Sequence, residues 1–430
     1  MAMKVKSIVT VIFVGISWNS FAASPYFKET EVRVHGTIHS EQSGDLLGWV
    51  AENLGDINGD GAGDFIVSAL SYGAGNGKFY VYSGGDMQLL HSQEGANFEQ
   101  LGRCTASAGD VNADGINDYI VTSTRRAVVY SGKDHKLLHS RTVAGEFFGF
   151  DCNFAGDLNH DGYGDLLVGA PFAAYGGNLS GRLYAISGKD FSDLWTFDGN
   201  ELARLGLGVG SVGGDINDDG IVDVVVSANG AGAKGEAYVL SGADGQLVHT
   251  LKPAGQASAT GLPTFGRFHI AGGGDVDNDG YFDVFVGDYN ARRGQENPNG
   301  QNTVTSGAGR AYVFSGKTGA KIHQFSAEHN GDGLGPGRVI PDINNDGYAD
   351  VYVAAYTYSD EIAFNGKAYL YDGKTGDLLR TMTGTVSSMF LGVDAANIDD
   401  VNGDGINDYI LTGIDWNLTG DGVIHIVLGH

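Results

Sequence analysis

The chain has 430 residues, with 70 Gly, 7 Pro and 2 Cys, and its 52 acidic against 26 basic side chains give a formal charge of −26. Gly is roughly twice as frequent as in an average protein, but the low Pro content excludes a collagen-like chain. The 42% share of apolar residues excludes a disordered acidic chain. Because the acidic excess repels phosphate backbones and anionic lipid, we expect no nucleic acid partner, and cations are the natural counter-charge.

The first 22 residues have the pattern of a signal peptide. Lys4 and Lys6 form a basic start, residues 7–16 form an apolar stretch too short to span a bilayer, and residues 20–22 offer small side chains at the cleavage positions. The alternatives are an uncleaved anchor or a buried strand. We expect cleavage near Ala22 or Ala23, a single mature domain over residues 23–430 without a transmembrane segment, and a secreted or periplasmic protein.

A nine-residue pattern, Asp-x-Asn/Asp-x-Asp-Gly-x-x-Asp, occurs seven times at spacings of 47 to 67 residues and fills the chain. Such a period indicates an array of supersecondary units. Positions 1, 3, 5 and 9 of each copy hold the candidate metal ligands, which are Asp56, Asn58, Asp60 and Asp64; Asp110, Asn112, Asp114 and Asp118; Asp157, Asn159, Asp161 and Asp165; Asp215, Asn217, Asp219 and Asp223; Asp275, Asp277, Asp279 and Asp283; Asp342, Asn344, Asp346 and Asp350; and Asp400, Asn402, Asp404 and Asp408.

Each copy lies inside a larger unit of short β-rich segments. A Leu-Gly or Phe-Gly step precedes the acidic loop, as at residues 47–48 and 148–149, and an apolar run of strand length follows it, as at residues 165–170. Two further runs, such as 309–316 and 321–325, are joined by a tight turn. Four antiparallel strands in each of seven units predict an all-β, seven-bladed β-propeller.

The two ends of the chain predict how the ring closes. The last unit stops after its third strand, at residues 422–429, and lacks an outer strand. Residues 31–39 form a β-rich run ahead of the first Leu-Gly step, in the place of a fourth strand. We therefore expect this N-terminal strand to complete the last blade, which would remove an open sheet edge.

The acidic loops predict up to seven calcium sites. Calcium takes six to eight oxygen ligands, which the side chains at positions 1, 3, 5 and 9 and a backbone carbonyl at position 7 can supply, and Gly at position 6 permits the sharp bend. The fifth loop alone has Asp at position 3, so all four of its side-chain ligands are acids, and we expect its site to be the tightest. The alternative is that these residues only form Asx turns, which seven complete copies make a weaker interpretation.

The Phe-Gly steps, the acidic loops and the Gly-Ala-Pro run at residues 169–171 resemble the FG-GAP repeats of the integrin α-chain N-terminal propeller. This resemblance covers nearly all of the mature chain, although Gly-Ala-Pro occurs in one unit only. It implies a calcium-binding β-propeller that acts in adhesion or ligand recognition. A fold hosts many functions, so it does not identify the ligand.

The face opposite the acidic loops is where we expect a ligand, because the variable connections lie there. The candidates are Asp288 to Ala308 with Arg292 and Arg293, Tyr356 to Asn365 with Phe364, and Trp416. Amide, Arg and aromatic groups suit a carbohydrate or a protein partner. The alternative is that these segments are ordinary solvated loops. We expect the protein itself to be a monomer.

An enzyme is the second functional hypothesis. Some polysaccharide lyases are seven-bladed propellers that use His, Tyr and Arg, which draws attention to Arg267, His269 and Tyr289. No Ser/His/Asp arrangement, zinc pattern or phosphate loop occurs, so we expect no catalytic residues. An enzyme would place polar residues close together in the central funnel. His91, His139, His249 and His323 fall at equivalent strand positions, which packing or hydrogen bonding explains.

The two cysteines allow opposite expectations. Cys104 and Cys152 precede the second and third acidic loops on neighbouring innermost strands, so a disulfide between blades is feasible in an oxidising compartment. They lie six and five residues ahead of their loops, and a shift of one residue turns a strand side chain to the other face, which argues against the bond.

Overall fold

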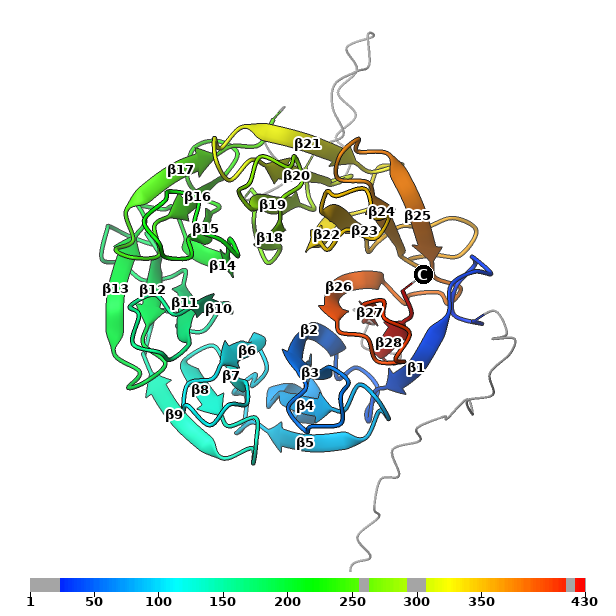
Figure 1. Ribbon diagram of the computed structural model, residues 1–430, viewed down its shortest axis with the longest axis horizontal. Helices are drawn as coiled ribbons and strands as arrows, with labels where there is room; N and C mark the ends of the chain where they lie inside the picture. The colour runs from blue at the N-terminus through cyan, green and yellow to red at the C-terminus, as the bar shows by residue number, and fades with distance from the viewer. Residues whose placement is uncertain (1–23, 255–262, 292–306, 415–421, 430) are drawn as a thin grey trace, which may run out of the picture.

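A computed structural model describes residues 24–254, 263–291, 307–414 and 422–429, and in this part of the chain it contains seven four-stranded antiparallel sheets. The sheets are arranged radially around a central axis, each with its first strand at the centre and its fourth at the rim (Figure 1). This is a seven-bladed β-propeller, as predicted.

The strands follow the repeat through the chain. The first three blades are β2 (Leu47–Gly55), β3 (Asp64–Ala69), β4 (Lys78–Tyr82) and β5 (Leu89–Glu94); β6 (Thr105–Gly109), β7 (Asp118–Thr122), β8 (Arg126–Tyr130) and β9 (Leu137–Thr142); and β10 (Cys152–Gly156), β11 (Asp165–Ala170), β12 (Arg182–Ile186) and β13 (Asp193–Asp198). The fourth and fifth blades are β14 (Leu205–Ser211), β15 (Val224–Ala228), β16 (Glu236–Leu240) and β17 (Leu247–Leu251); and β18 (Ile270–Gly274), β19 (Asp283–Asp288), β20 (Arg310–Phe314) and β21 (Lys321–Ser326). The sixth and seventh are β22 (Leu334–Ile340), β23 (Asp350–Ala355), β24 (Lys367–Tyr371) and β25 (Leu378–Thr383); and β26 (Leu391–Ile398), β27 (Asp408–Gly413), β28 (Val423–Val427) and β1 (Val34–His39).

The N-terminal strand closes the ring as predicted. β1 pairs antiparallel with β28, with Ile38 opposite Ile424 and Thr37 opposite His425. Phe27, further upstream, bridges to Gly384 in the sixth blade and is buried. The start of the described chain therefore joins the last two blades.

The hydrophobic core is divided among the seams between blades. Each seam is filled by a cluster of buried side chains from two neighbouring sheets. Second strands such as β11 are buried along their whole length, whereas fourth strands such as β13 are partly exposed. This gradient explains why strands that follow the acidic loops are continuously apolar.

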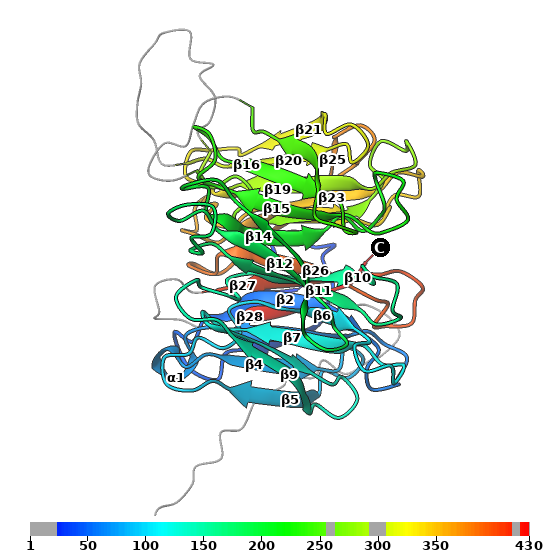
Figure 2. The same cartoon turned by 90° about the vertical axis from the view of Figure 1, so that its left-hand side faces the viewer.

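The propeller has two distinct faces. The connections between strands one and two, which are the acidic loops, share one face with the turns between strands three and four, and we call it the loop face. The connections between strands two and three, including the short helix α1 (Tyr72–Gly75), share the other face with the segments that join blades. Figure 2 shows α1 on one side of the disc and the C-terminus towards the other.

Candidate functional site

The ninth residue of each acidic loop is buried beneath the loop. All seven of these Asp side chains have 0% of their surface exposed. In every loop one carboxylate oxygen accepts the N–H of position 2 at 2.7–3.0 Å, and the other accepts the N–H of a Gly that follows the third strand of the same blade at 2.8–3.2 Å. This carboxylate therefore joins the start of the loop to the next turn.

The remaining loop residues form Asx turns around position 5. The position 1 carboxylate accepts the N–H groups of positions 5 and 6, and the position 5 carboxylate accepts the N–H of position 7, in all seven copies. Gly at position 6 has φ of 86–92°, which favours glycine. Position 4 is also left-handed, although only Gly59 and Gly403 are glycines there.

Burial disfavours the charged form of the position 9 carboxyls. It raises the pKa of Asp64, Asp165 and Asp408 to about 6 and that of Asp283 to about 7, against the lowering effect of the backbone N–H donors. Nearby loop carboxylates add to the increase. These groups are thus poised to gain from a cation that neutralises them.

The fifth loop differs from the other six in its third residue. In the first loop the Asn58 amide donates to Asp60 at 2.9 Å and to Asp64 at 3.3 Å, so a neutral donor separates two carboxylates. Asp277 of the fifth loop cannot donate in this way. Asp275, Asp277 and Asp283 bring oxygen atoms within 4.8 Å of one another, and burial and like charge raise the pKa of Asp277.

The donor chemistry of the loops fits calcium. Each offers hard oxygen ligands from three or four carboxylates, with Asn oxygen in six copies, and these are the groups calcium prefers. Asp275, Asp277, Asp279 and Asp283 would hold the ion in the fifth loop, and the equivalent residues would do so elsewhere.

A cavity of about 610 Å³ occupies the centre of the ring and opens on the face opposite the acidic loops, which we now call the channel face. At its mouth the Arg103 guanidinium lies over the rings of Phe150 at 4.1 Å, Trp49 at 5.1 Å and Phe268 at 5.6 Å. The Trp49 indole donates to the Arg103 carbonyl at 3.0 Å. The mouth is therefore aromatic and cationic.

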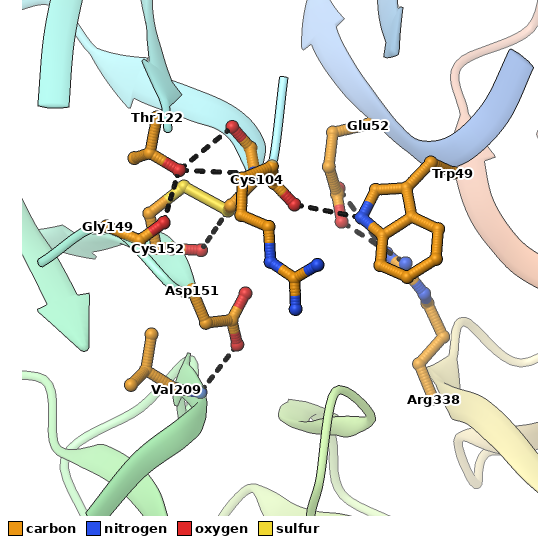
Figure 3. Close-up of a disulfide and its surroundings, with 10 residues drawn as sticks. Trp49, Glu52, Cys104, Thr122, Gly149, Asp151, Cys152, Val209 and Arg338 are labelled. Atoms are coloured by element: carbon orange, nitrogen blue, oxygen red, sulfur yellow. Dashed lines mark hydrogen bonds and ion pairs between the residues drawn. A yellow bond between two sulfur atoms is a disulfide. The ribbon is translucent and has the colours of Figure 1, made fainter. Parts of the chain in front are cut away.

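A second arginine lies deeper in this cavity. Arg338 pairs with Glu52 at 3.2 Å and with Asp394 at 3.4 Å. Burial opposes the charge of Arg338, but the two carboxylates outweigh it and raise its pKa. Burial also raises the pKa of Asp394 to about 6. Figure 3 shows Glu52 and Arg338 beside Trp49.

Part of the ligand region predicted from the sequence reaches this cavity. Tyr289 and Tyr356 line it, with ring centroids 6.2 Å apart, whereas Phe364 lies exposed against Phe390. Arg292, Arg293 and Trp416 lie outside the described residues.

Arg267, His269 and Tyr289, which the enzyme hypothesis singled out, line the same cavity. The Tyr289 hydroxyl and the Arg267 guanidinium interact. Burial, with a contribution from Arg338, lowers the pKa of His269 to about 3, so this imidazole is neutral at physiological pH.

Trp49, Arg103 and Phe150 at the channel mouth were missed by the sequence reasoning, which singled out Arg267, although a signal for them exists. The position directly after the Leu-Gly or Phe-Gly glycine lines the central cavity in six of the seven blades, the exception being Leu207. Its occupants are Trp49, Arg103, Phe150, Leu207, Arg267, Pro336 and Val393. A repeated position that holds six residue types in seven copies could have been identified from spacing alone.

Cys104 and Cys152 form a disulfide with Cα atoms 5.9 Å apart (Figure 3). The argument from the one-residue offset was wrong because the two strands belong to different sheets. Between the third and fourth blades, Asp151 accepts the N–H of Val209 at 2.8 Å. Asp151 lies two residues after the glycine of its Phe-Gly step, and Val209 lies three residues after the glycine of the next step. Cys104 and Cys152 hold the same two positions one blade earlier, so the offset is what aligns them.

The equivalent histidines have a structural role, as expected. A ring near the start of an outer strand packs on the turn of the next blade, where His35 bonds to the Gly85 carbonyl at 3.1 Å and Trp195 donates to the Gly242 carbonyl at 2.7 Å. His323 contacts the Gly373 carbonyl in the same way.

Comparison with known proteins identifies the repeat. A family model described as FG-GAP repeat matches residues 154–186. The chain is 28% identical to integrin alpha-5 of Xenopus laevis over 206 residues, which are 43% of this chain and 19% of that protein. It is 34% identical to integrin alpha-3 of Cricetulus griseus over 168 residues, 36% of this chain and 16% of that protein. The chain is a β-propeller with an FG-GAP repeat, and it is similar to integrin α chains.

The similarity has a limited extent. This FG-GAP propeller spans about a fifth of the length of those curated relatives. A solved structure of BBS1N in complex with ARL6DN superposes with a TM-score of 0.56 over 93% of this chain and 97% of that chain, at 11% identity, which shows the fold alone. Among the described residues, no helix is long and apolar enough to cross a membrane.

Proposed function

We propose that this chain is an exported calcium-binding propeller that acts in adhesion or ligand recognition, with a carbohydrate or a protein bound on its channel face. The observation that carries the proposal is the contrast between the faces. Seven equivalent oxygen-rich loops occupy one face, and an aromatic, cationic cavity opens on the other. The similarity to integrin α chains supports recognition or adhesion.

Exposed apolar side chains on the channel face further support recognition. Phe98 is 75% exposed, and Tyr175, Leu202, Phe364 and Val386 are 44–57% exposed, all in connections that reach this face. Apolar side chains that are exposed in these connections are available for contact with a partner. On the opposite face, calcium would stabilise the loop that connects the first and second strands of each blade.

Metal counting on the dialysed mature protein tests calcium binding. We expect several calcium ions per chain, and Asp279→Ala should lower the melting temperature in calcium more than Asp377→Ala, whose carboxylate is exposed outside the acidic loops. Bound metal below one ion per chain, or equal melting of the two variants, would leave the loops as Asx-turn scaffolds.

A polysaccharide-processing enzyme is the second candidate, because Arg267, His269 and Tyr289 converge in the central cavity. Buried polar groups close together in a funnel are what catalysis requires. Incubation with uronate polysaccharides, followed by chain-length analysis, tests it. Shortened chains that Tyr289→Phe abolishes would favour the enzyme, and intact chains would favour recognition.

A further inference from the structure

The arginines of the central cavity are unequally paired. Arg338 has two carboxylate partners, whereas in the described part of the chain Arg103 and Arg267 form no ion pair with any carboxylate. The Nε atoms of Arg103 and Arg267 and the Oγ1 of Thr105, which also lines the cavity, are buried without hydrogen-bond partners there. A buried cation or polar group without a partner is costly.

The environment of Arg103 sharpens this imbalance. Burial lowers its pKa to about 10, Asp151 opposes the decrease and the like charge of Arg267 adds to it. Burial in turn raises the pKa of Asp151 to about 7, although the charge of Arg103 opposes this increase. An anion bound between Arg103 and Arg267 would relieve both the desolvation and the mutual repulsion.

Three other cations on the channel face have carboxylate partners. Lys78 pairs with Glu41 at 2.8 Å, Arg126 with Glu99 at 2.6 Å, and Arg182 with Asp198 at 2.6 Å. These residues begin or adjoin the third strands at the edge of the same face. Arg103 and Arg267, which line the cavity, have no such carboxylate partner among the described residues.

We infer that the channel mouth binds a short acidic sugar, with its carboxylate held by Arg103 and Arg267. Guanidinium groups bind carboxylates in a bidentate geometry. Trp49, Phe150 and Phe268 supply aromatic surface at the mouth, and deeper Glu52, Asn153 and Ser211 supply acceptors and donors for hydroxyl groups.

The cavity favours a small ligand over an acidic protein segment. Its volume of about 610 Å³ lies within the range of small-molecule sites, roughly 300–1,000 Å³. The acidic groups below the mouth would repel further carboxylates, whereas sugar hydroxyls can donate to them. The formal charge of −26 likewise disfavours a long polyanion. This inference rests on the proposed ligand-recognition function.

Calorimetric titration of the mature protein in calcium tests the inference with four probes: sodium D-glucuronate, D-glucose, sodium acetate and a tri-glutamate peptide. We expect saturable glucuronate binding, with glucose and acetate at least tenfold weaker, because each lacks either the carboxylate or the ring. No glucuronate binding, or equal binding of glucose, would overturn the inference. Tighter binding of tri-glutamate would replace the sugar by an acidic peptide.

Substitutions test the two arginines. Arg103→Gln and Arg267→Gln should each weaken glucuronate binding at least tenfold, whereas Arg125→Gln, at an exposed arginine on the same face, should leave it within twofold. Arg267→Lys keeps the charge without the planar fork, so it should bind between wild type and Arg267→Gln. Wild-type affinity in both Gln variants would overturn the assignment.

Melting curves separate this inference from the proposed function. Each variant is used only if it melts cooperatively in calcium, and Arg267→Lys serves if a Gln variant does not fold. A protein that is stabilised by calcium but binds no glucuronate refutes the sugar site alone. Glucuronate binding by a protein that calcium does not stabilise refutes the calcium role alone.

Discussion

The loop face and the channel face of this propeller are built from the same repeat but use it in opposite ways. On the loop face all seven copies keep the same carboxylates and the same backbone hydrogen bonds, and only Asp277 departs from the Asn of the other loops. On the channel face one position holds Trp49, Arg103, Arg267 and four other residue types. Uniform positions hold the fold together, and variable positions give this chain its own chemistry.

Calcium removal should give the largest effect if the loop face stabilises the fold. A ligand present at 100 times its Kd stabilises by about 2.7 kcal/mol per site, so seven filled sites should raise the melting midpoint by roughly 20 °C. Thermal melts in EGTA and in millimolar calcium measure this, with magnesium as the control ion. Coincident curves in EGTA and calcium would show that the loops need no metal.

Loss of the disulfide tests the stability of the channel side. The bond joins residues separated by 48 positions, so Cys104→Ala with Cys152→Ala should destabilise by about 4 kcal/mol. Urea unfolding measures the change. A reducing agent should lower the stability of wild type to that of the double variant and leave the variant unchanged; a reductant effect on the variant would point to another cause.

Asp165→Ala tests whether position 9 stabilises the fold without metal. The substitution leaves the N–H groups of Leu158 and Gly188 without acceptors, which should cost about 3 kcal/mol even in EGTA. Asp377→Ala, at an exposed side chain, is the matched control in the same unfolding assay. If Asp165→Ala lowers the stability only in calcium, the buried carboxylate acts as a metal ligand, and its hydrogen bonds to Leu158 and Gly188 do not stabilise the fold.

Asp277→Asn converts the fifth loop to the pattern of the others and should give the smallest effect. Removing one of three clustered carboxylates should raise stability in EGTA by less than about 1 kcal/mol and weaken calcium binding in that loop. Asn217→Asp, the reverse change in the fourth loop, should act in the opposite direction. The same sign for both variants would refute the charge argument.

The sequence predicted the fold well because its signals are periodic and local. The blades are defined by the seven acidic loops and by the continuous apolar runs after them. Their closure is defined by the additional β-rich run at residues 31–39, ahead of the first unit. The calcium ligand sets remain predictions, since oxygen-rich loops are equally compatible with Asx turns.

The channel could not be assembled from the sequence in the same way. Trp49, Arg103 and Arg267 belong to different blades, and they converge only because the ring closes. The relation between Cys104 and Cys152 depends on the step between neighbouring sheets, which strand periodicity within one sheet does not describe. Contacts that arise from closure therefore need the three-dimensional arrangement.

The hydrogen bond from Val209 to Asp151, which joins two neighbouring blades, has an equivalent where the ring closes. Asp394 of the seventh blade accepts the N–H of Ala51 in the first at 2.9 Å, as Asp151 does from Val209. The last blade thus docks on the first through the same joint as an internal pair. Since Leu428 donates to the Arg33 carbonyl at 3.0 Å, the two ends are adjacent. The order of blades is therefore cyclic, and circular permutants that begin at another blade should fold into the same ring.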